Sequence, residues 1–168
     1  MTVKRFTNEY FGTLISEATL SPRSRQHSNI HQCYDDPCQR LFNAIGVDSY
    51  IRPHRHSLDP KDECLIAVAG LFALVTFSDD GTVSEVVRFG SEKYSTLENV
   101  SFGVELSPGT WHTVIALVPN SVIFELKAGP FDPKAAKEPA PWAPAEDSSQ
   151  AASYVYQLNC LVRGATDE

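Results

Sequence analysis

The spacing of hydrophobic residues changes along the chain. Between residues 6 and 15 aromatic and aliphatic residues recur at near-helical intervals, which predicts a short amphipathic helix near the N-terminus. A second helix is predicted over residues 37–45. Asp36 suits its N-cap, Pro37 its first position and Gly46 the residue after its last turn.

After Gly46 the hydrophobic residues follow a period of two, which is typical of strands. The expected strands are Tyr50–His56, Cys64–Ala69, Leu71–Phe77, Val83–Phe89, Val100–Leu106, Trp111–Val118 and Val122–Lys127. Short strands at roughly ten-residue spacing, with no helices between them, predict an antiparallel sandwich or barrel. We therefore expect one all-β domain over residues 47–146, closed by a proline-rich segment. Residues 1–46 would pack on it, and residues 147–168 would form a tail that fits an edge strand, a subunit contact or a short helix.

Composition narrows the function classes. The chain has 168 residues, a net charge of -7 and an isoelectric point near 5.2, which argue against nucleic acid as a partner. It has no apolar run of the roughly 18 residues that a membrane helix needs. No secretory signal is visible, so we expect a cytoplasmic protein whose cysteines are free thiols. The exposed edges of a small barrel and the apolar tail predict a homodimer.

Histidines carry the clearest chemical signal. His54 and His56 lie two residues apart on a predicted strand, so their side chains share one face. Glu63 follows after a short loop, and His112 opens a later strand. Three imidazoles and one carboxylate suit a divalent first-row metal, so we predict one bound ion. The ligand set leaves Fe, Zn, Ni and Mn open.

Polar residues on the same strands predict a pocket beside this metal site. Tyr50 and Arg52 precede His54 at two-residue intervals, so all three share one strand face. Glu125 and Lys127 likewise share a face of the last strand. The pair formed by Glu125 and Lys127 fits either a structural salt bridge or a role in the site. The residues expected near the rim are His31, Arg40 and Asn43. Such a lining suits an anionic, hydroxyl-rich ligand, with Arg52 as a binding group and Tyr50, Glu125 or Lys127 moving a proton.

The motifs resemble those of the cupin superfamily, with His54–His56, Glu63 and Gly70 in the first and Pro108–His112 in the second. This resemblance implies a jelly-roll β-barrel. Much of the chain is also similar to the WbuC family of cupin-fold metalloproteins, found among bacterial surface-polysaccharide genes. The matching segments are Ser21–Arg25, Asn29–His31, Asp36–Ala44, Tyr50–His56, Pro108–His112, Phe124–Pro130 and Ala140–Pro144.

Three functions follow from the predicted site. The first is a metal-dependent isomerase, epimerase or lyase that acts on a sugar or sugar nucleotide. The second is a non-catalytic, metal-braced module that binds or senses a sugar. The third is an Fe(II) dioxygenase, which needs open coordination positions for oxygen. An open metal position that faces a polar pocket favours an enzyme, whereas a closed tetrahedron favours a structural metal.

Overall fold

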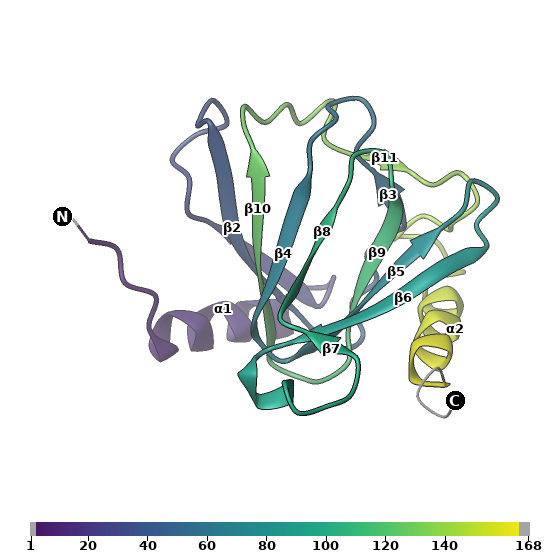
Figure 1. Cartoon of the computed structure of the whole chain (residues 1–168), viewed down its shortest axis with the longest axis horizontal. Coiled ribbons are helices and arrows are strands. Elements are labelled where there is room, and N and C mark those ends of the chain that lie inside the picture. The colour runs from purple at the N-terminus through teal and green to yellow at the C-terminus, as the bar shows by residue number, and fades with distance from the viewer. Residues whose placement is uncertain (1–2, 165–168) are drawn as a thin grey trace.

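Two β-sheets face each other in the structure, a computed structural model that describes residues 3–164 (Figure 1). The five-stranded sheet has the order β1-β2-β10-β4-β8 and the six-stranded sheet β11-β3-β9-β5-β6-β7. The strands are β1 (Arg25–Asn29), β2 (Cys38–Ile45), β3 (His54–Arg55), β4 (Glu63–Ala69), β5 (Leu71–Phe77), β6 (Val83–Gly90), β7 (Val100–Ser101), β8 (Gly103–Leu106), β9 (Trp111–Ala116), β10 (Ser121–Ala128) and β11 (Glu138–Pro139). A short 3-10 helix, η1 (Glu92–Tyr94), follows β6. This is the single jelly-roll barrel of the cupin fold, as predicted.

The barrel core lies between the two sheets, where alternate residues of each strand point inward. Phe72, Leu74 and Phe89 from one sheet pack against Leu65 and Ile123 from the other, and all five are buried. This core fills the end of the barrel where β4 and β9 finish. At the opposite end, toward the top of Figure 1, β2, β4 and β9 begin and β10 finishes. The polar site residues of β4, β9 and β10 come from this end.

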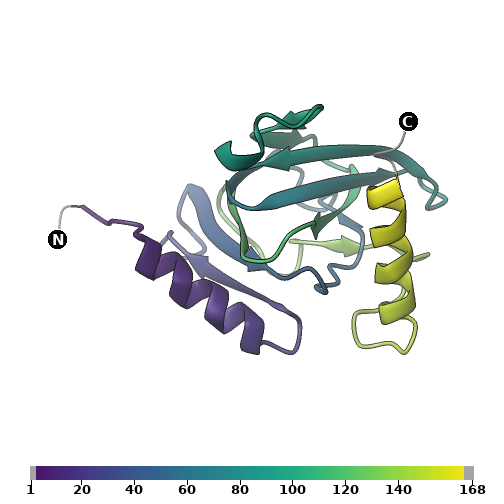
Figure 2. The same cartoon turned by 90° about the horizontal axis from the view of Figure 1, so that it is seen from below.

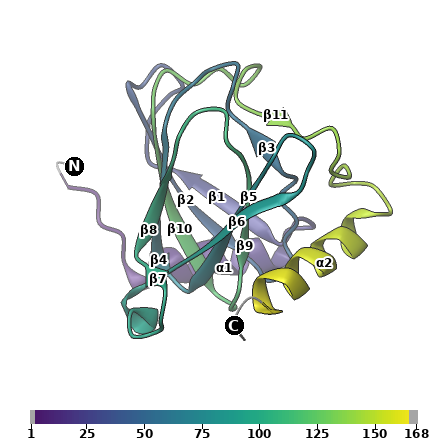
Figure 3. The same cartoon turned by 45° about the vertical axis from the view of Figure 1, so that its right-hand side comes forward.

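The two helices cover the outer faces of the two sheets, on opposite sides of the barrel (Figure 2). Helix α1 (Asn8–Leu20) begins after Thr7, whose side chain accepts a hydrogen bond from the Tyr10 amide, and it buries Leu14 against the five-stranded sheet. Helix α2 (Ala151–Gly164) buries Leu158 and Val162 against the six-stranded sheet. Both helices lie away from the loops that cross the site end of the barrel (Figure 3).

The helix predicted over residues 37–45 is wrong, because this segment forms strand β2. β2 pairs with β1 and β10, and α1 covers its outer face, so both faces carry apolar residues and a simple alternation is hidden. Phe42 packs beneath α1, while Asn43 lines the interior. The Asp36 side chain does accept a hydrogen bond from a backbone amide, that of Cys38 at 3.0 Å. This bond closes a turn instead of capping a helix. The first sheet thus includes residues that we expected to pack on the barrel.

The sequence left three forms open for the C-terminal tail: an edge strand, a subunit contact or a short helix. In the structure the tail forms a helix, α2. The Arg88 guanidinium donates to the Val162 carbonyl at 2.6 Å, which ties the last turn of α2 to β6. Among residues 3–164, neither helix has the length and hydrophobicity that a membrane span requires.

Candidate metal centre

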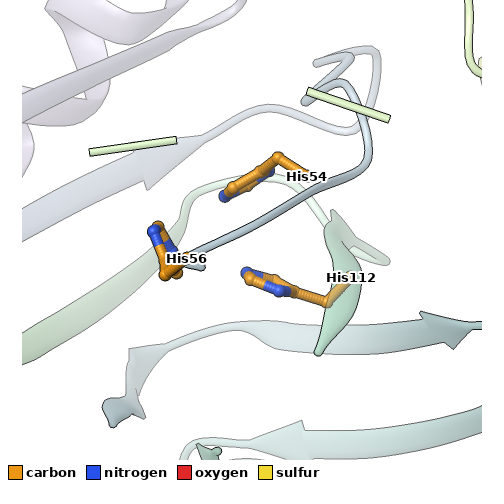
Figure 4. A group of neighbouring side chains, drawn as sticks. All are labelled: His54, His56 and His112. Atoms are coloured by element: carbon orange, nitrogen blue, oxygen red, sulfur yellow. The ribbon is translucent and has the colours of Figure 1, made fainter. Parts of the chain in front are cut away.

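Three buried histidines converge at the site end of the barrel (Figure 4). His54 lies on β3 and pairs directly with His112 on β9, while His56 follows β3. One ring nitrogen from each residue lies within 4.8 Å of the other two. The structure therefore brings together the two motifs that carry the predicted ligands.

Main-chain carbonyls fix how the three rings are turned. The Nδ1 atoms of His54, His56 and His112 lie 2.9, 2.5 and 2.9 Å from the carbonyl oxygens of Arg52, Ala136 and Thr110. A carbonyl can only accept, so each Nδ1 carries the proton and donates it. The Nε2 atoms then face the centre of the cluster as potential ligands, which is the arrangement found in metal-binding histidines.

Glu63 adds negative charge to this cluster. It begins β4, and its Oε2 lies 3.2 Å from His56 Nε2 and 3.3 Å from His112 Nε2. The loop between His56 and Glu63 accommodates their long spacing in the sequence. A carboxylate oxygen this close to imidazole lone pairs needs a cation or a proton between them. The buried donor set of three imidazoles and one carboxylate therefore fits a divalent metal.

Electrostatics keep these groups in the forms that a metal binds. Burial, followed by the charge of Lys137, holds the pKa of His54 well below its usual range, so its ring stays neutral. Burial alone would raise the pKa of Glu63. Contact with His112 and His56 and the charge of Lys127 outweigh this effect and hold that pKa well below the usual value. Glu63 is therefore ionised while His54 is neutral.

A cavity of about 350 Å³ opens onto the centre and is lined by strands of the five-stranded sheet and by the segment that follows β10. His56 and Glu63 form part of its wall, together with Lys127. Glu125 also lines the cavity and accepts a hydrogen bond from the Asn43 amide at 3.1 Å. Burial, and then the negative charge of Glu63, raise the pKa of Glu125, which favours its protonated form. The site thus combines a carboxyl group with a lowered pKa at the centre and a carboxyl group with a raised pKa beside it.

The structure brings some of the predicted pocket residues to the cavity and not others. His31, Asn43, Glu125 and Lys127 line it. Arg40 does not line the cavity, because it lies three residues from Asn43 along strand β2 and therefore on the opposite, outer face. There it pairs with Asp36 at 3.3 Å. This corrects the expected rim position of Arg40.

The expected places of Tyr50 and Arg52 are also corrected, because neither lines the cavity. The chain is not a regular strand before His54, so the two-residue alternation does not extend back to them. The Tyr50 hydroxyl donates to the Pro144 carbonyl at 2.8 Å, and its ring packs on Tyr154 of α2. Arg52 donates to the Ala140 carbonyl at 2.6 Å. Both contacts tie the barrel to its proline-rich closing segment.

Trp111 points away from the centre, as alternation with His112 predicted. Its indole nitrogen donates to Asp79 at 2.9 Å, and the Arg55 guanidinium stacks 4.2 Å from its ring. Sequence reasoning missed Gln39, which lines the cavity and whose buried amide donates to the main-chain carbonyls of Cys33, Tyr34 and Asp36. Reading residues 38–45 as a strand would have placed Gln39 beside Asn43. It also missed Lys137, whose surrounding sequence has no regular pattern.

The fold and the buried histidines define a class of protein, a barrel of the cupin type with a histidine cluster that fits a metal ion. Within this class, the chain belongs to the family described as "Domain of unknown function (DUF6016)", whose model matches residues 6–89. None of the curated proteins compared with the chain matches it. The finer similarity to the WbuC family stays a prediction.

Solved structures with a similar fold share little sequence with this chain. Protein SO0799 from Shewanella oneidensis is 11% identical with a TM-score of 0.54, over 82% of this chain and 83% of that one. KdgF from Halomonas sp. is 17% identical with a TM-score of 0.48, over 66% and 83%. Oxalate decarboxylase from Bacillus subtilis is 10% identical with a TM-score of 0.49, over 68% of this chain and 27% of that one. At such identities, the likeness concerns the fold alone.

Proposed function

We propose that the protein is a metal-dependent enzyme of the isomerase, epimerase or lyase type, acting on an anionic sugar or sugar nucleotide in bacterial surface-polysaccharide metabolism. One observation carries this proposal: His56 and Glu63 belong both to the metal centre and to the cavity wall. A ligand in the cavity therefore reaches the metal directly. A structural metal would instead be enclosed by protein on all sides.

Each residue of the centre has a role in this proposal. His54, His56 and His112 hold the ion through Nε2, with Glu63 as the fourth ligand. The ion is Fe, Zn, Ni or Mn, and when bound it polarises a carbonyl or hydroxyl group of the substrate. Glu125 holds a proton within the cavity and is the candidate general acid, since burial favours its neutral form.

The remaining cavity residues select the ligand. Lys127 supplies positive charge next to the centre, and Lys137 adds a second ammonium to the cavity lining. His31 and Asn43 also line the cavity and offer hydrogen bonds to hydroxyl groups. This mixture favours an anionic, hydroxyl-rich molecule over an apolar one.

The centre also supports a second candidate, a metal-braced sugar-binding or sensor module. Its favouring observation is that the four candidate ligands join β3, β4 and β9, so an ion would tie both sheets together at one end. An Fe(II) dioxygenase is a third candidate, which iron content and oxygen consumption would identify.

Metal content and ligand screening test the proposal together. The double variant His54→Ala with His56→Ala should lose the stoichiometric metal that the wild-type protein retains on purification. His27→Ala is the matched control, because His27 lines the cavity but lies outside the cluster. Full metal content in the double variant would contradict the assignment.

The metal-loaded protein is then screened by thermal shift against sugars, sugar phosphates and nucleotide sugars, and each binder is followed by NMR. Conversion of a binder by the wild-type protein, but not by the double variant, supports an enzyme. Binding without conversion supports the sugar-binding module. Stabilisation by apolar ligands only would contradict both.

A further inference from the structure

The Lys127 ammonium contacts two of the candidate metal ligands. Its Nζ lies 2.9 Å from Glu63 Oε1 and 3.1 Å from His56 Nε2. The contact follows from the sheet register, in which Lys127 on β10 lies directly opposite Glu63 on β4. The Lys127 side chain is 17% exposed, so it meets the cavity rather than bulk solvent.

The partners of His56 determine the state of its ring. The Ala136 carbonyl can only accept a hydrogen bond, so the Nδ1 of His56 carries a proton. The Lys127 ammonium can only donate, so it contacts the lone pair of His56 Nε2, an atom that also lies 3.2 Å from Glu63 Oε2. The lone pair that accepts this hydrogen bond is the same one that a metal would require.

Glu63 presents no such conflict. Its Oε1 faces Lys127, whereas its Oε2 faces His56 and His112. Lys127 can therefore keep its ion pair with Glu63 while the other oxygen binds a metal. A metal on Nε2 of His56 would enter between that atom and Glu63 Oε2, whereas the positively charged Lys127 contact with the same atom would have to break.

We propose that Lys127 and a divalent metal compete for the Nε2 atom of His56, and that metal binding turns the Lys127 ammonium into the cavity, where it binds an anionic group of the ligand. This inference rests on the proposed function. The flexible lysine stem allows the movement, and Lys127 already lines the cavity on the same strand face as Glu125. Metal loading thereby creates the anion-binding position that the substrate needs.

Metal affinity tests the competition directly, without any assay of activity. Zn²⁺ affinities are measured by competition with a chelating dye for the wild-type protein, Lys127→Met and Lys137→Met. Lys137 also lines the cavity and acts on His54 through its charge, but among the described residues it makes no hydrogen bond to His56, so its variant removes a charge without removing that contact. Lys127→Met should bind Zn²⁺ about tenfold more tightly than wild type, because a charged hydrogen bond no longer competes. Lys137→Met should change the affinity much less.

Equal tightening in the two variants would overturn the competition, since long-range charge would then explain both. Weaker binding by Lys127→Met would also overturn it. The outcome for the proposed function is separate: if neither the wild-type protein nor Lys127→Met binds Zn²⁺, the metal site itself is wrong. If both bind with equal affinity, only the competition fails. Thermal melting of each variant confirms that it is folded.

A second experiment tests whether the Lys127 ammonium binds an anion in the cavity of the metal-loaded protein. The Co²⁺-loaded proteins are titrated with azide, a small anion whose binding changes the visible spectrum of cobalt. Lys127→Met should bind azide about tenfold more weakly than wild type, while Lys137→Met should show a smaller loss. Equal azide affinities for wild type and Lys127→Met would overturn the anion-binding role.

Discussion

His54 and His112 lie directly opposite each other across β3 and β9, with ring centroids 4.5 Å apart. β3 has only two residues, so this one pairing aligns the first histidine motif with the second. His56 and Glu63 then approach from the chain that follows β3. The centre therefore depends on strand register as much as on the identity of its ligands.

We predict that Glu63→Gln lowers metal affinity by about tenfold or more, since losing even an outer partner of a metal ligand commonly costs that much. The amide keeps the shape of the side chain but removes its negative charge. A chelator competition assay measures the change. Glu105→Gln is the matched control, because Glu105 is an exposed carboxylate on the neighbouring strand β8. Unchanged affinity in Glu63→Gln would exclude Glu63 as a ligand.

We predict that Glu125→Gln stabilises the metal-free protein at pH 7 on the order of 1 kcal/mol. Burial and the charge of Glu63 raise the pKa of Glu125 above its ordinary value of 4.5. Its protonated form therefore supports folding fully below pH 4.5, and this contribution is lost as the pH rises through the folded-state pKa. Glutamine imitates the protonated form at every pH.

Urea unfolding of wild type and Glu125→Gln at pH 7 and at pH 4 measures this difference. The gain should vanish at pH 4, where the wild-type carboxyl is also protonated. An equal gain at both values would show that the effect comes from packing rather than from charge.

Much of the fold could be predicted because its strands are short apolar or alternating runs that turn residues separate. β4, β5, β6 and β10 lie close to their predicted ranges for this reason. The histidine cluster was also accessible, since residues two apart on a strand share a face, and His54 and His56 keep this relation. The alternation between Trp111 and His112 worked in the same way.

The errors arose where tertiary contacts hide or interrupt the alternation. α1 covers the outer face of β2, so apolar residues occur on both of its faces and imitate a helix. The strand before His54 stops early, which turns Tyr50 and Arg52 toward the proline-rich segment. The local sequence pattern reveals neither the covering of β2 by α1 nor the early end of the strand before His54, because both depend on segments distant in the sequence.

Two glycines with positive φ provide a matched test of backbone strain. Gly70 has φ +84°, and a Cβ there would lie 2.1 Å from Ser121 Oγ. Gly109 has φ +80°, but a Cβ there would meet nothing within 4 Å. Gly109→Ala should therefore cost only the left-handed strain of about 1–2 kcal/mol. Gly70→Ala should cost about 2–5 kcal/mol, because a steric clash is added. Urea unfolding measures both, and equal costs would contradict the packing at Gly70.

The predicted homodimer now has a different candidate surface. The tail that suggested it folds as α2 on the barrel of its own chain. The outer face of β4 and its neighbours instead exposes Ile66, Phe102 and Leu126, at 39%, 57% and 37% of their surface. Phe102 directly precedes β8, an edge strand that pairs only with β4 among residues 3–164, while Ile66 is on β4 and Leu126 on the next strand, β10. Exposed edges and apolar patches of this kind are commonly covered by a second copy.

We therefore expect Ile66→Lys to shift the protein from dimer to monomer in sedimentation at micromolar concentration, because a buried ammonium at the subunit contact would be unpaired. Leu20→Lys is the control, since Leu20 is exposed at the end of α1, away from β4. It should leave the dimer intact. A wild-type protein that sediments as a monomer would contradict the homodimer itself, whereas an Ile66→Lys variant that stays dimeric would show that the two copies meet through another face.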